Sequence, residues 1–347
     1  MKKYFITGVA GFIGSYLAKR ILNEEKDVLV IGLDSVNDYY DVNLKEYRLS
    51  GLEEFSNFKF IKGNLADKKC VENIFKEYNP SIVVNLAAQA GVRYSITNPD
   101  AYIEANLIGF YNILECCRHY PVEHLVYASS SSVYGGNTKV PFSTDDKVDN
   151  PVSLYAATKK SNELLAHSYS KLYNIPSTGL RFFTVYGPAG RPDMAYFGFT
   201  NKLLAGEKIK IFNYGNCKRD FTYIDDIVEG IIRVMKKAPE KKNGEDGLPI
   251  PPYKVYNIGN SNPENLLDFV NILQEELIRA GVLPKDYDFE SHKELVPMQA
   301  GDVPVTYADT TPLERDFGFK PHTSLRDGLR KFAEWYKEFY IDRKSDK

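Results

Sequence analysis

Continuous apolar runs alternate with stretches of helical periodicity over residues 1–183. The apolar runs predict strands at 3–7, 28–33, 58–62, 82–87, 124–129 and 178–183. Apolar positions three and four residues apart predict helices at 12–24, 67–77, 99–119 and 153–173. Strands that alternate with helices usually pair in parallel and are covered on both faces of their sheet. The pattern therefore predicts an α/β fold with a doubly wound parallel sheet.

The pattern becomes less regular in the second half of the chain. It predicts helices at 198–205, 225–237, 264–280 and 323–340, and short strands at 209–212 and 254–258. The segment 236–252 is rich in Lys, Gly and Pro, which indicates a solvated surface loop. We expect a smaller α/β domain beside the main one. The predicted main domain comprises 1–183 and about 220–262, and the smaller domain comprises 184–219 and 263–347.

Composition argues against several classes of protein, namely those that bind nucleic acid, membranes or metals. The chain has 347 residues, of which 43% are hydrophobic, and its 44 Lys and Arg nearly balance its 46 Asp and Glu. Because net charge is small, we expect no nucleic acid or membrane as a partner, and no apolar run is long enough to cross a bilayer. The five histidines lack ligand spacing, so we expect no metal. The four cysteines fit no metal or disulfide pattern, which favours a reducing cytoplasm.

A glycine-rich segment carries the first chemical signal. The sequence TGVAGFIG at 7–14 follows a predicted strand and opens a helix, so its backbone can approach a pyrophosphate at the helix N-terminus. Asp34 ends the next strand, where a carboxylate can accept hydrogen bonds from both ribose hydroxyls of adenosine. It would repel a 2′-phosphate, and no Lys or Arg follows before Lys45, so NAD is favoured over NADP. These features predict a Rossmann-type domain, and a glycine-rich turn with a surface aspartate is the alternative.

A tyrosine and a lysine, Tyr155 and Lys159, are one helical turn apart. A neighbouring ammonium favours phenolate, so we expect Lys159 to lower the pKa of Tyr155 and make it a proton acceptor. Lys159 can also bind the nicotinamide ribose. An ordinary amphipathic helix with an exposed lysine is the alternative. The serine run 129–132 ends the preceding strand without a carboxylate, and turn chemistry is the alternative there.

Further motifs extend along the chain. They are NLAA at 85–88, Asn106, SSSSVYG at 129–135, YAATK at 155–159, RFFTVYGP at 181–188, KRDFTYIDD at 218–226 and GDV at 301–303. With the glycine segment and Asp34, they resemble the extended short-chain dehydrogenase/reductase family over nearly the whole chain, in its nucleotide-sugar epimerase branch. The segments QAGVRYS at 89–95, PVSLY at 151–155, GPAGRPDM at 187–194 and MQAGDV at 298–303 resemble those of bacterial UDP-glucuronate 4-epimerases.

The resemblance implies bound NAD and a catalytic set of Ser130, Tyr155 and Lys159. One departure is Asn64, which stands where the family commonly has an aspartate facing the adenine amino group. An asparagine carbonyl can still accept that bond. The residues that the resemblance assigns to the NAD site are Gly8, Gly11, Phe12, Ile13, Gly14, Asp34, Asn37, Asn64, Leu65, Leu86, Ala87, Ala88, Asn106, Tyr155, Lys159 and Phe182.

The resemblance also implies a UDP-sugar substrate. Arg219 takes the position that binds the diphosphate, and Asp302 the position that binds the uridine ribose. Gln299 stands where epimerases of neutral hexoses usually have a second arginine, which leaves Arg191 as a second cation. The uracil is expected near Lys210 to Phe212. The expected substrate-binding residues are Arg93, Ser130, Ser131, Ser132, Thr184, Arg191, Lys210, Phe212, Arg219, Gln299 and Asp302, and loop ion pairs are the alternative for Arg93 and Arg191.

The serine run distinguishes three reactions that share a 4-keto intermediate. Related 4,6-dehydratases have an Asp-Glu pair at the positions of Ser131 and Ser132, and glucuronate decarboxylases have a glutamate at Ser132. A 4-keto uronic acid loses carbon dioxide readily when its carboxylate bond aligns with the carbonyl π system. The neutral hydroxyls of Ser131, Ser132 and Thr184 suit a carboxylate held out of that alignment. The residues therefore favour a UDP-glucuronate 4-epimerase that acts through transient reduction of NAD.

Alternatives remain for function and assembly. The chain could instead epimerise UDP-glucose and UDP-galactose or decarboxylate UDP-glucuronate, and a non-catalytic NAD-binding regulator ranks lower because the Ser/Tyr/Lys set is intact. Helices 99–119 and 153–173 resemble those that form a four-helix bundle across a homodimer in this family. Their apolar residues could equally be intramolecular core: Leu107, Ile108, Phe110, Leu164 and Leu165.

Overall fold

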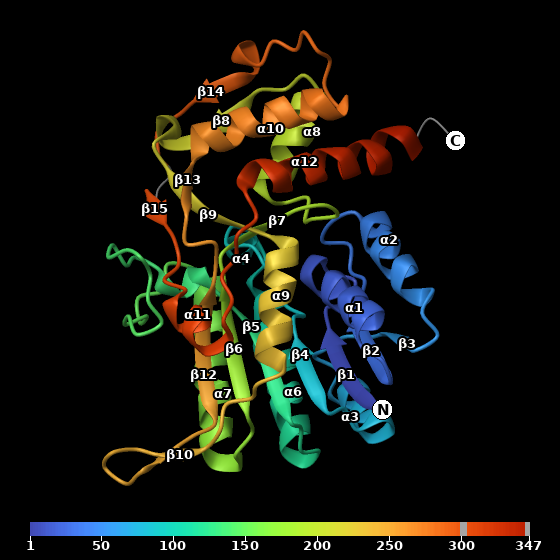
Figure 1. Ribbon diagram of the computed structural model, residues 1–347, viewed down its shortest axis with the longest axis vertical. Helices are drawn as coiled ribbons and strands as arrows, with labels where there is room; N and C mark the ends of the chain where they lie inside the picture. Colours follow the sequence, from blue (N-terminus) through green and yellow to red (C-terminus); the bar gives the residue numbers. More distant parts are fainter. Residues whose placement is uncertain (299–303, 344–347) are drawn as a thin grey trace.

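A parallel seven-stranded sheet forms the centre of the main lobe in the computed structural model, which describes residues 1–298 and 304–343 (Figure 1). Its strands run in the order β12-β6-β5-β4-β1-β2-β3. Their bounds are β1 (Lys2–Thr7), β2 (Val28–Asp34), β3 (Phe58–Lys62), β4 (Ile82–Asn85), β5 (His124–Ser130), β6 (Ser177–Phe182) and β12 (Tyr253–Ile258). The central strands are buried on both faces, which explains their continuous apolar runs.

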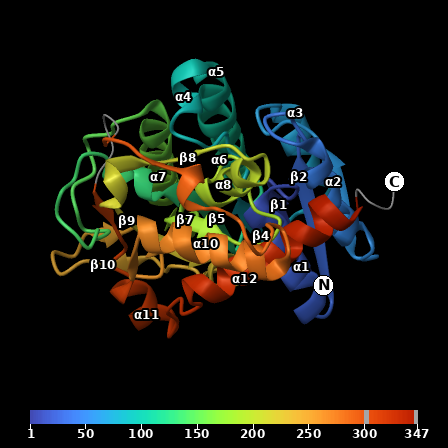
Figure 2. The same ribbon diagram turned by 90° about the horizontal axis from the view of Figure 1, so that it is seen from above.

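Helices cover both faces of this sheet, as the views from the front and from above show (Figures 1 and 2). One layer contains α1 (Phe12–Glu24), α2 (Val42–Glu53) and α9 (Ile224–Met235). The other contains α3 (Lys68–Tyr78), α6 (Gly109–His119) and α7 (Leu154–Tyr173). The segment before α6 consists of α4 (Tyr94–Thr97), α5 (Pro99–Tyr102) and a π-helix, Ile103–Ile108. The predicted doubly wound parallel sheet is confirmed.

A smaller α/β lobe lies beyond the carboxyl ends of these strands (Figure 1). In one of its sheets, β9 pairs with β7, β13 and β15; in the other, β8 pairs with β14. The strands are β7 (Thr184–Tyr186), β8 (Ile209–Ile211), β9 (Lys218–Tyr223), β13 (Pro263–Asn265), β14 (Lys293–Leu295) and β15 (Val305–Thr306). The helices are α8 (Ala195–Leu204), α10 (Leu266–Ala280) and α12 (Leu325–Tyr336).

Several elements differ from the sequence prediction. Helix α2 was not predicted, because its buried face includes Lys45 and Arg48 beside leucines and so lacks a clear apolar stripe. The short strands β7, β9, β13, β14 and β15 and helix α11 (Thr311–Phe317) were also missed. The expected loop 236–252 contains a short hairpin, β10 (Lys242–Asn243) with β11 (Pro249–Ile250), that extends from the body (Figure 1). Strand β12, which the sequence groups with the less regular segments, is an edge strand of the main sheet.

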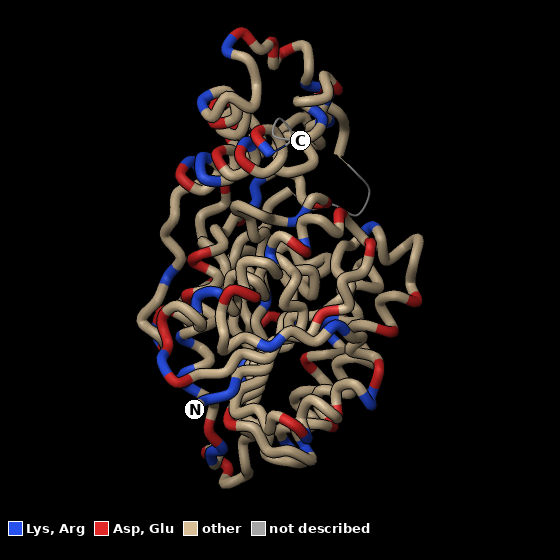
Figure 3. The backbone as a smooth tube through the Cα atoms, turned by 90° about the vertical axis from the view of Figure 1, so that its right-hand side faces the viewer, with Lys and Arg blue, Asp and Glu red and all other residues tan. Residues whose placement is uncertain are grey.

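Charged residues of both signs are interspersed along the chain (Figure 3). This distribution agrees with the near balance of 44 basic and 46 acidic residues. Within residues 1–298 and 304–343, no helix combines the length and the apolar character that a membrane span requires.

Candidate active site

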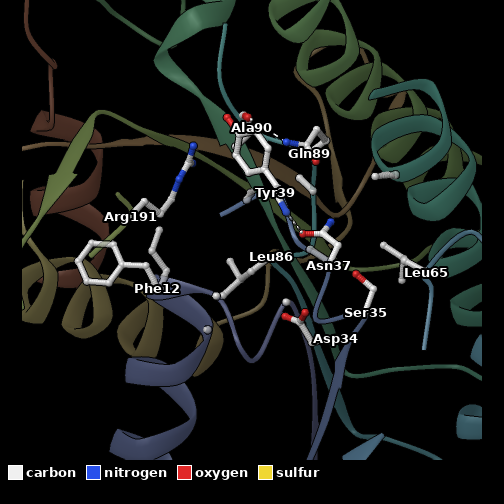
Figure 4. A pocket seen from close by; sticks show the side chains of 18 of the residues that line it. Phe12, Asp34, Ser35, Asn37, Tyr39, Leu65, Leu86, Gln89, Ala90 and Arg191 are labelled. Atoms are coloured by element: carbon white, nitrogen blue, oxygen red, sulfur yellow. Dashed lines mark hydrogen bonds between the residues drawn. The ribbon is translucent and has the colours of Figure 1, made fainter. Parts of the chain in front are cut away.

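A cavity opens at the carboxyl ends of the main-sheet strands, where doubly wound sheets bind ligands (Figure 4). Most residues predicted to bind NAD or to act in catalysis line it. They are Gly8, Gly11, Phe12, Ile13, Gly14, Asp34, Asn37, Asn64, Leu65, Leu86, Ala87, Ala88, Ser130, Tyr155, Lys159 and Phe182. Residues distant in the sequence therefore meet at one edge of one sheet.

The glycine loop leaves room for a pyrophosphate next to the backbone. Gly8 has a φ of 72°, and a Cβ there would lie 2.8 Å from the backbone nitrogen of Ala87. A Cβ on Gly11 would lie 2.8 Å from the carbonyl oxygen of Gly8. Helix α1 begins at Phe12, so its N-terminal N–H groups face this loop. The loop thus fits the diphosphate of a dinucleotide, since larger residues would collide with backbone atoms.

Asp34 joins two loops at the adenosine end of the cavity. Its Oδ2 accepts a hydrogen bond from the Ala10 N–H at 3.0 Å, and its Oδ1 accepts one from the Val36 N–H at 2.8 Å. A carboxylate has further lone pairs that can accept ribose hydroxyls. The side chain therefore fixes the glycine loop and remains suited to the ribose role that the sequence predicts.

The wall next to Asp34 contains residues that the sequence did not reveal, including Tyr39, Tyr40 and Lys45. The Lys45 ammonium donates to the Asn37 carbonyl at 2.6 Å and to its Oδ1 at 2.7 Å. Burial lowers the pKa of Lys45. Although Lys45 is eleven residues after Asp34 in sequence, α2 brings it into the cavity wall. Its bonds to Asn37 hold the loop after β2 in place. The sequence did not place Lys45 in the site because it did not predict α2.

The predicted catalytic residues lie on two elements. Ser130 is the last residue of β5, and its Oγ lies 3.1 Å from Ser132 Oγ and accepts from the Ser132 N–H at 3.1 Å. Tyr155 lies in the first turn of α7, whose N-cap Ser153 accepts from the Ala156 N–H. Lys159 is only 3% exposed, and its ammonium donates to the Ala128 carbonyl at 2.9 Å. The cap and this bond fix α7 against the end of β5.

The protonation of this site differs from the sequence prediction. Burial raises the pKa of Tyr155, against the opposing effects of its hydrogen bond with Ser130 and the charge of Arg191. Burial lowers the pKa of Lys159 to about 8. The prediction that Lys159 lowers the pKa of Tyr155 is therefore wrong for this structure. The physical reason is that desolvation of the phenol dominates, and the opposing cation is Arg191.

Asn106 does not line the cavity, although the sequence places it in the NAD site. It is buried behind the wall, where its Oδ1 accepts from the Gln89 N–H at 2.8 Å and its Nδ2 donates to the Gln89 carbonyl at 3.0 Å. Its Nδ2 also donates to Thr158 Oγ1 at 3.1 Å. Asn106 thus holds Gln89, which does line the cavity, against α7.

Among the predicted substrate residues, only Ser130 and Arg191 line this cavity. Those outside it are Arg93, Ser131, Ser132, Thr184, Lys210, Phe212 and Arg219, while Gln299 and Asp302 lie outside the described residues. The Arg93 guanidinium lies 6.0 Å from the Phe212 ring centroid, so the structure brings these two together. The Arg219 Nη1 donates to the Pro304 carbonyl at 3.2 Å.

Arg191 occupies the wall where three loops meet (Figure 4). Its Nε donates to Asp193 Oδ1 at 3.0 Å, and the Tyr39 hydroxyl donates to Asp193 Oδ2 at 3.3 Å. The buried Arg48 adds a second link, since it donates to the carbonyls of Ala10 and Ala189. These bonds connect the loops that follow β1, β2 and β7 around the cavity.

The glycine loop, Asp34 and the Ser-Tyr-Lys set at one sheet edge define a dinucleotide-dependent enzyme of the Rossmann class. Residues 4–259 match the model of the NAD dependent epimerase/dehydratase family, and the chain belongs to this family. The predicted resemblance is thereby confirmed, and NAD is the cofactor of the family.

Similarity to known proteins covers nearly the whole chain. Protein CapI of Staphylococcus aureus is 54% identical over 344 residues, which cover 97% of this chain and 99% of that protein. UDP-glucuronate 4-epimerase 4 of Arabidopsis thaliana is 46% identical over 342 residues, or 96% of this chain and 75% of that protein. A crystal structure of UDP-glucuronic acid 4-epimerase from Bacillus cereus with UDP-glucuronic acid and NAD has a TM-score of 0.84 and 31% identity, and covers 97% of this chain and 100% of that one.

Proposed function

We propose that this protein is a UDP-glucuronate 4-epimerase, which interconverts UDP-glucuronate and UDP-galacturonate through a 4-keto intermediate. The observation that carries the proposal is the serine turn 130–132, which has no carboxylate and begins at the cavity beside Tyr155. The names of the Arabidopsis and Bacillus cereus proteins support the same substrate. The reaction has no net redox change, so no second electron carrier is needed.

NAD held by the glycine loop and Asp34 would supply the acceptor and donor of the hydride at C4 of the sugar. The protein residues handle the proton. Tyr155 takes the proton of the 4-hydroxyl, and Ser130, which shares a hydrogen bond with the phenol, relays it. Because burial raises the pKa of Tyr155, phenolate must be stabilised by a cation, and the charge of Arg191, which lines the same cavity, acts in that direction. Lys159 is assigned to the nicotinamide ribose. At neutral pH, Lys159 is mostly charged, since its pKa is about 8.

The substrate groups are assigned to the residues that the sequence predicts for them. Arg219 and Arg191 bind the diphosphate, because a planar guanidinium gives paired charged hydrogen bonds. Ser131, Ser132 and Thr184 bind the uronate carboxylate. Lys210 and Phe212 meet the uracil, and Arg93, Gln299 and Asp302 complete the site. In this proposal the domain of 1–183 and about 220–262 binds NAD, and that of 184–219 and 263–347 binds the UDP-sugar.

We further propose a homodimer, located in the cytoplasm, through a four-helix bundle of the α5–α6 segment and α7. Phe110 is buried in the core, so it is not available for this contact. Ile108 and Leu164, by contrast, are 47% and 60% exposed, and Tyr111 adds to the exposed apolar surface. Leu164→Glu is expected to give monomers in size-exclusion chromatography with light scattering, and an unchanged mass would contradict the dimer interface.

The test of function follows the substrate directly. The purified protein is denatured to release and identify its nucleotide, and UDP-glucuronate is then followed by NMR with the native protein. Formation of UDP-galacturonate with no added oxidant or reductant supports the proposal. Conversion to UDP-xylose or a 4-keto pentose would identify a decarboxylase, and activity confined to UDP-glucose would identify a hexose epimerase. Absence of turnover with bound NAD would favour a regulator.

A further inference from the structure

A buried ion pair lies beneath the catalytic serine turn. Arg181 on β6 and Glu163 on α7 are each about 3% exposed. The guanidinium donates from Nε to Glu163 Oε1 at 2.8 Å and from Nη2 to Glu163 Oε2 at 2.9 Å. Burial opposes ionisation of Glu163, but its bonds to Arg181 and the charge of Arg181 outweigh it, so the pKa of Glu163 lies below its ordinary value. Both groups are therefore charged at neutral pH.

This pair contacts both ends of the turn that contains Ser130, Ser131 and Ser132. At the start, the Ser129 hydroxyl donates to Glu163 Oε1 at 2.7 Å. At the end, the Arg181 guanidinium lies 4.9 Å from the ring centroid of Tyr134, the last residue of the 3₁₀ turn Ser131–Tyr134. The Tyr134 hydroxyl donates to Asn257 Oδ1 at 2.6 Å, which fixes the ring. One ion pair thus fixes the turn from two sides.

The same pair fixes the tyrosine helix relative to the serine strand. Ser129 and Arg181 are register partners on β5 and β6, and the next register pair joins Ser130 to Phe182, both of which line the cavity. Glu163 follows Tyr155 and Lys159 at intervals of four residues, so all three share one face of α7. Helix α7 lies against both strands (Figure 1). Glu163 therefore connects the helix of the base to the strand of the catalytic hydroxyl.

Net stability alone does not account for such a pair. The desolvation of two buried charges can equal or exceed their attraction, and apolar pairs of similar volume are often as stable. In addition, the Arg181 Nη1 is a buried donor without a partner among the described residues. The sequence did not single out Glu163, and it named Arg181 only within a motif, because the contact joins α7 to two strands.

We propose that Arg181 and Glu163 form a positioning pair. Through Ser129 and Tyr134, which flank the serine turn 130–132, the pair holds this turn against Tyr155 and thereby protects the 4-keto uronate from decarboxylation. This inference rests on the proposed function. In the competing reaction the C5–C6 bond breaks, carbon dioxide leaves, and the electron pair moves to the C4 carbonyl oxygen as an enolate, after which C5 takes a proton. A turn that shifts by about 1 Å would misplace the hydroxyls at Ser131 and Ser132, and such shifts lower rates by about 10²-fold.

The central experiment uses Glu163→Asp, which keeps the charge and withdraws the carboxylate from Ser129. We expect kcat for UDP-glucuronate to fall about 10²-fold, with a much smaller change in KM, and decarboxylated product to form a larger share of the total in NMR. Ser129→Ala, which leaves the ion pair intact, is expected to lower kcat by about 10-fold. Ser129→Thr keeps the hydroxyl and should restore both kcat and the product ratio.

Glu276→Gln is the matched control, because Glu276 is also about 3% exposed and bonded to an arginine, Arg326, at 2.9 Å, but lies on α10 in the smaller lobe. It should lower the melting temperature without changing the product ratio. A wild-type product ratio in folded Glu163→Asp and Ser129→Ala would overturn the positioning role. If Glu163→Asp does not fold, the product ratios of Ser129→Ala and Ser129→Thr are compared instead. Equal ratios in these two variants would then overturn the positioning role. Failure of the wild-type protein to make UDP-galacturonate would overturn the proposed function instead.

Discussion

The cofactor side and the sugar side of the site are built differently. On the cofactor side, 15 of the 16 residues predicted from the sequence line one cavity, and the exception, Asn106, supports its wall. On the sugar side, of the predicted residues that the structure describes, only Ser130 and Arg191 line it. The cofactor residues follow the ends of neighbouring parallel strands, whereas the sugar residues come from short strands and loops of two lobes. The predicted cofactor residues therefore meet in one cavity, whereas the predicted sugar residues are spread over both lobes.

The two sides also differ in how they are fixed. Bonds within the chain hold the cofactor side, through Asp34 to Ala10, Lys45 to Asn37, and Arg48 to Ala189. On the sugar side, Arg219 is bonded to the backbone at Pro304, which precedes β15 of the smaller lobe. We expect substitutions on the cofactor side to change nucleotide binding, and substitutions on the sugar side to change KM or product.

The largest effect is expected at Tyr155, where the two sides meet. Tyr155→Phe removes the proton acceptor and should lower turnover at least about 10³-fold, while the nucleotide stays bound. NMR of UDP-glucuronate and absorbance of the nucleotide released on denaturation measure the two properties. Tyr169→Phe on the same helix is the control, since it loses only a bond to Glu115. Full turnover of Tyr155→Phe would refute the proposed base.

A carboxylate placed in the serine turn should have the next largest effect. Two like charges 4 Å apart repel by about 4 kcal/mol at an effective dielectric constant of 20, so Ser132→Glu should lower kcat/KM for UDP-glucuronate at least about 10²-fold. Ser132→Gln introduces a side chain of nearly the same size without the charge, so kcat/KM for UDP-glucuronate should fall less. Equal losses in both variants would show that volume, and not charge, matters at this position.

Arg219 tests the diphosphate assignment on the sugar side. Charged hydrogen bonds contribute about 1.5–3 kcal/mol, so Arg219→Met should raise KM for UDP-glucuronate by about 10- to 10²-fold and leave nucleotide content unchanged. Arg330→Met on α12, which loses an ion pair with Asp327, should leave KM unchanged. Loss of the nucleotide from Arg219→Met would show that the two sides are not separable.

Asp34 tests the cofactor side. Asp34→Asn replaces a carboxylate that accepts from Ala10 and Val36, and should weaken NAD binding by about 10-fold, as one charged hydrogen bond predicts. Titration calorimetry of the nucleotide-free protein measures the affinity. The neighbouring exposed Asp38→Asn is the control. A raised KM for UDP-glucuronate with an unchanged affinity for NAD would contradict the assignment of Asp34 to the cofactor side.

The smallest effect is a pH dependence from Lys159. Because its pKa is about 8, half of the ammonium is lost at that pH, and kcat/KM should fall by about twofold there and further as pH rises. The free energy of unfolding should change with pH in the opposite direction to kcat/KM. Between about pH 8 and 10.5 the unfolded state binds more protons at this lysine, so its contribution to the free energy of unfolding rises with pH. A flat rate profile to pH 9.5 would contradict the low pKa.

Periodicity and spacing within short segments predicted the main sheet, the glycine loop, Asp34 and the Ser-Tyr-Lys set, and the structure brings these residues to one cavity. The sequence did not reveal α2, since packing buries Lys45 and Arg48 on the face where apolar residues are expected. The charges around Tyr155 and its desolvation follow only from the folded chain, because both depend on everything packed around the phenol. The tertiary structure also decided that Arg181 and Glu163 meet under the serine turn, since strand register and helix packing bring together residues from separate segments.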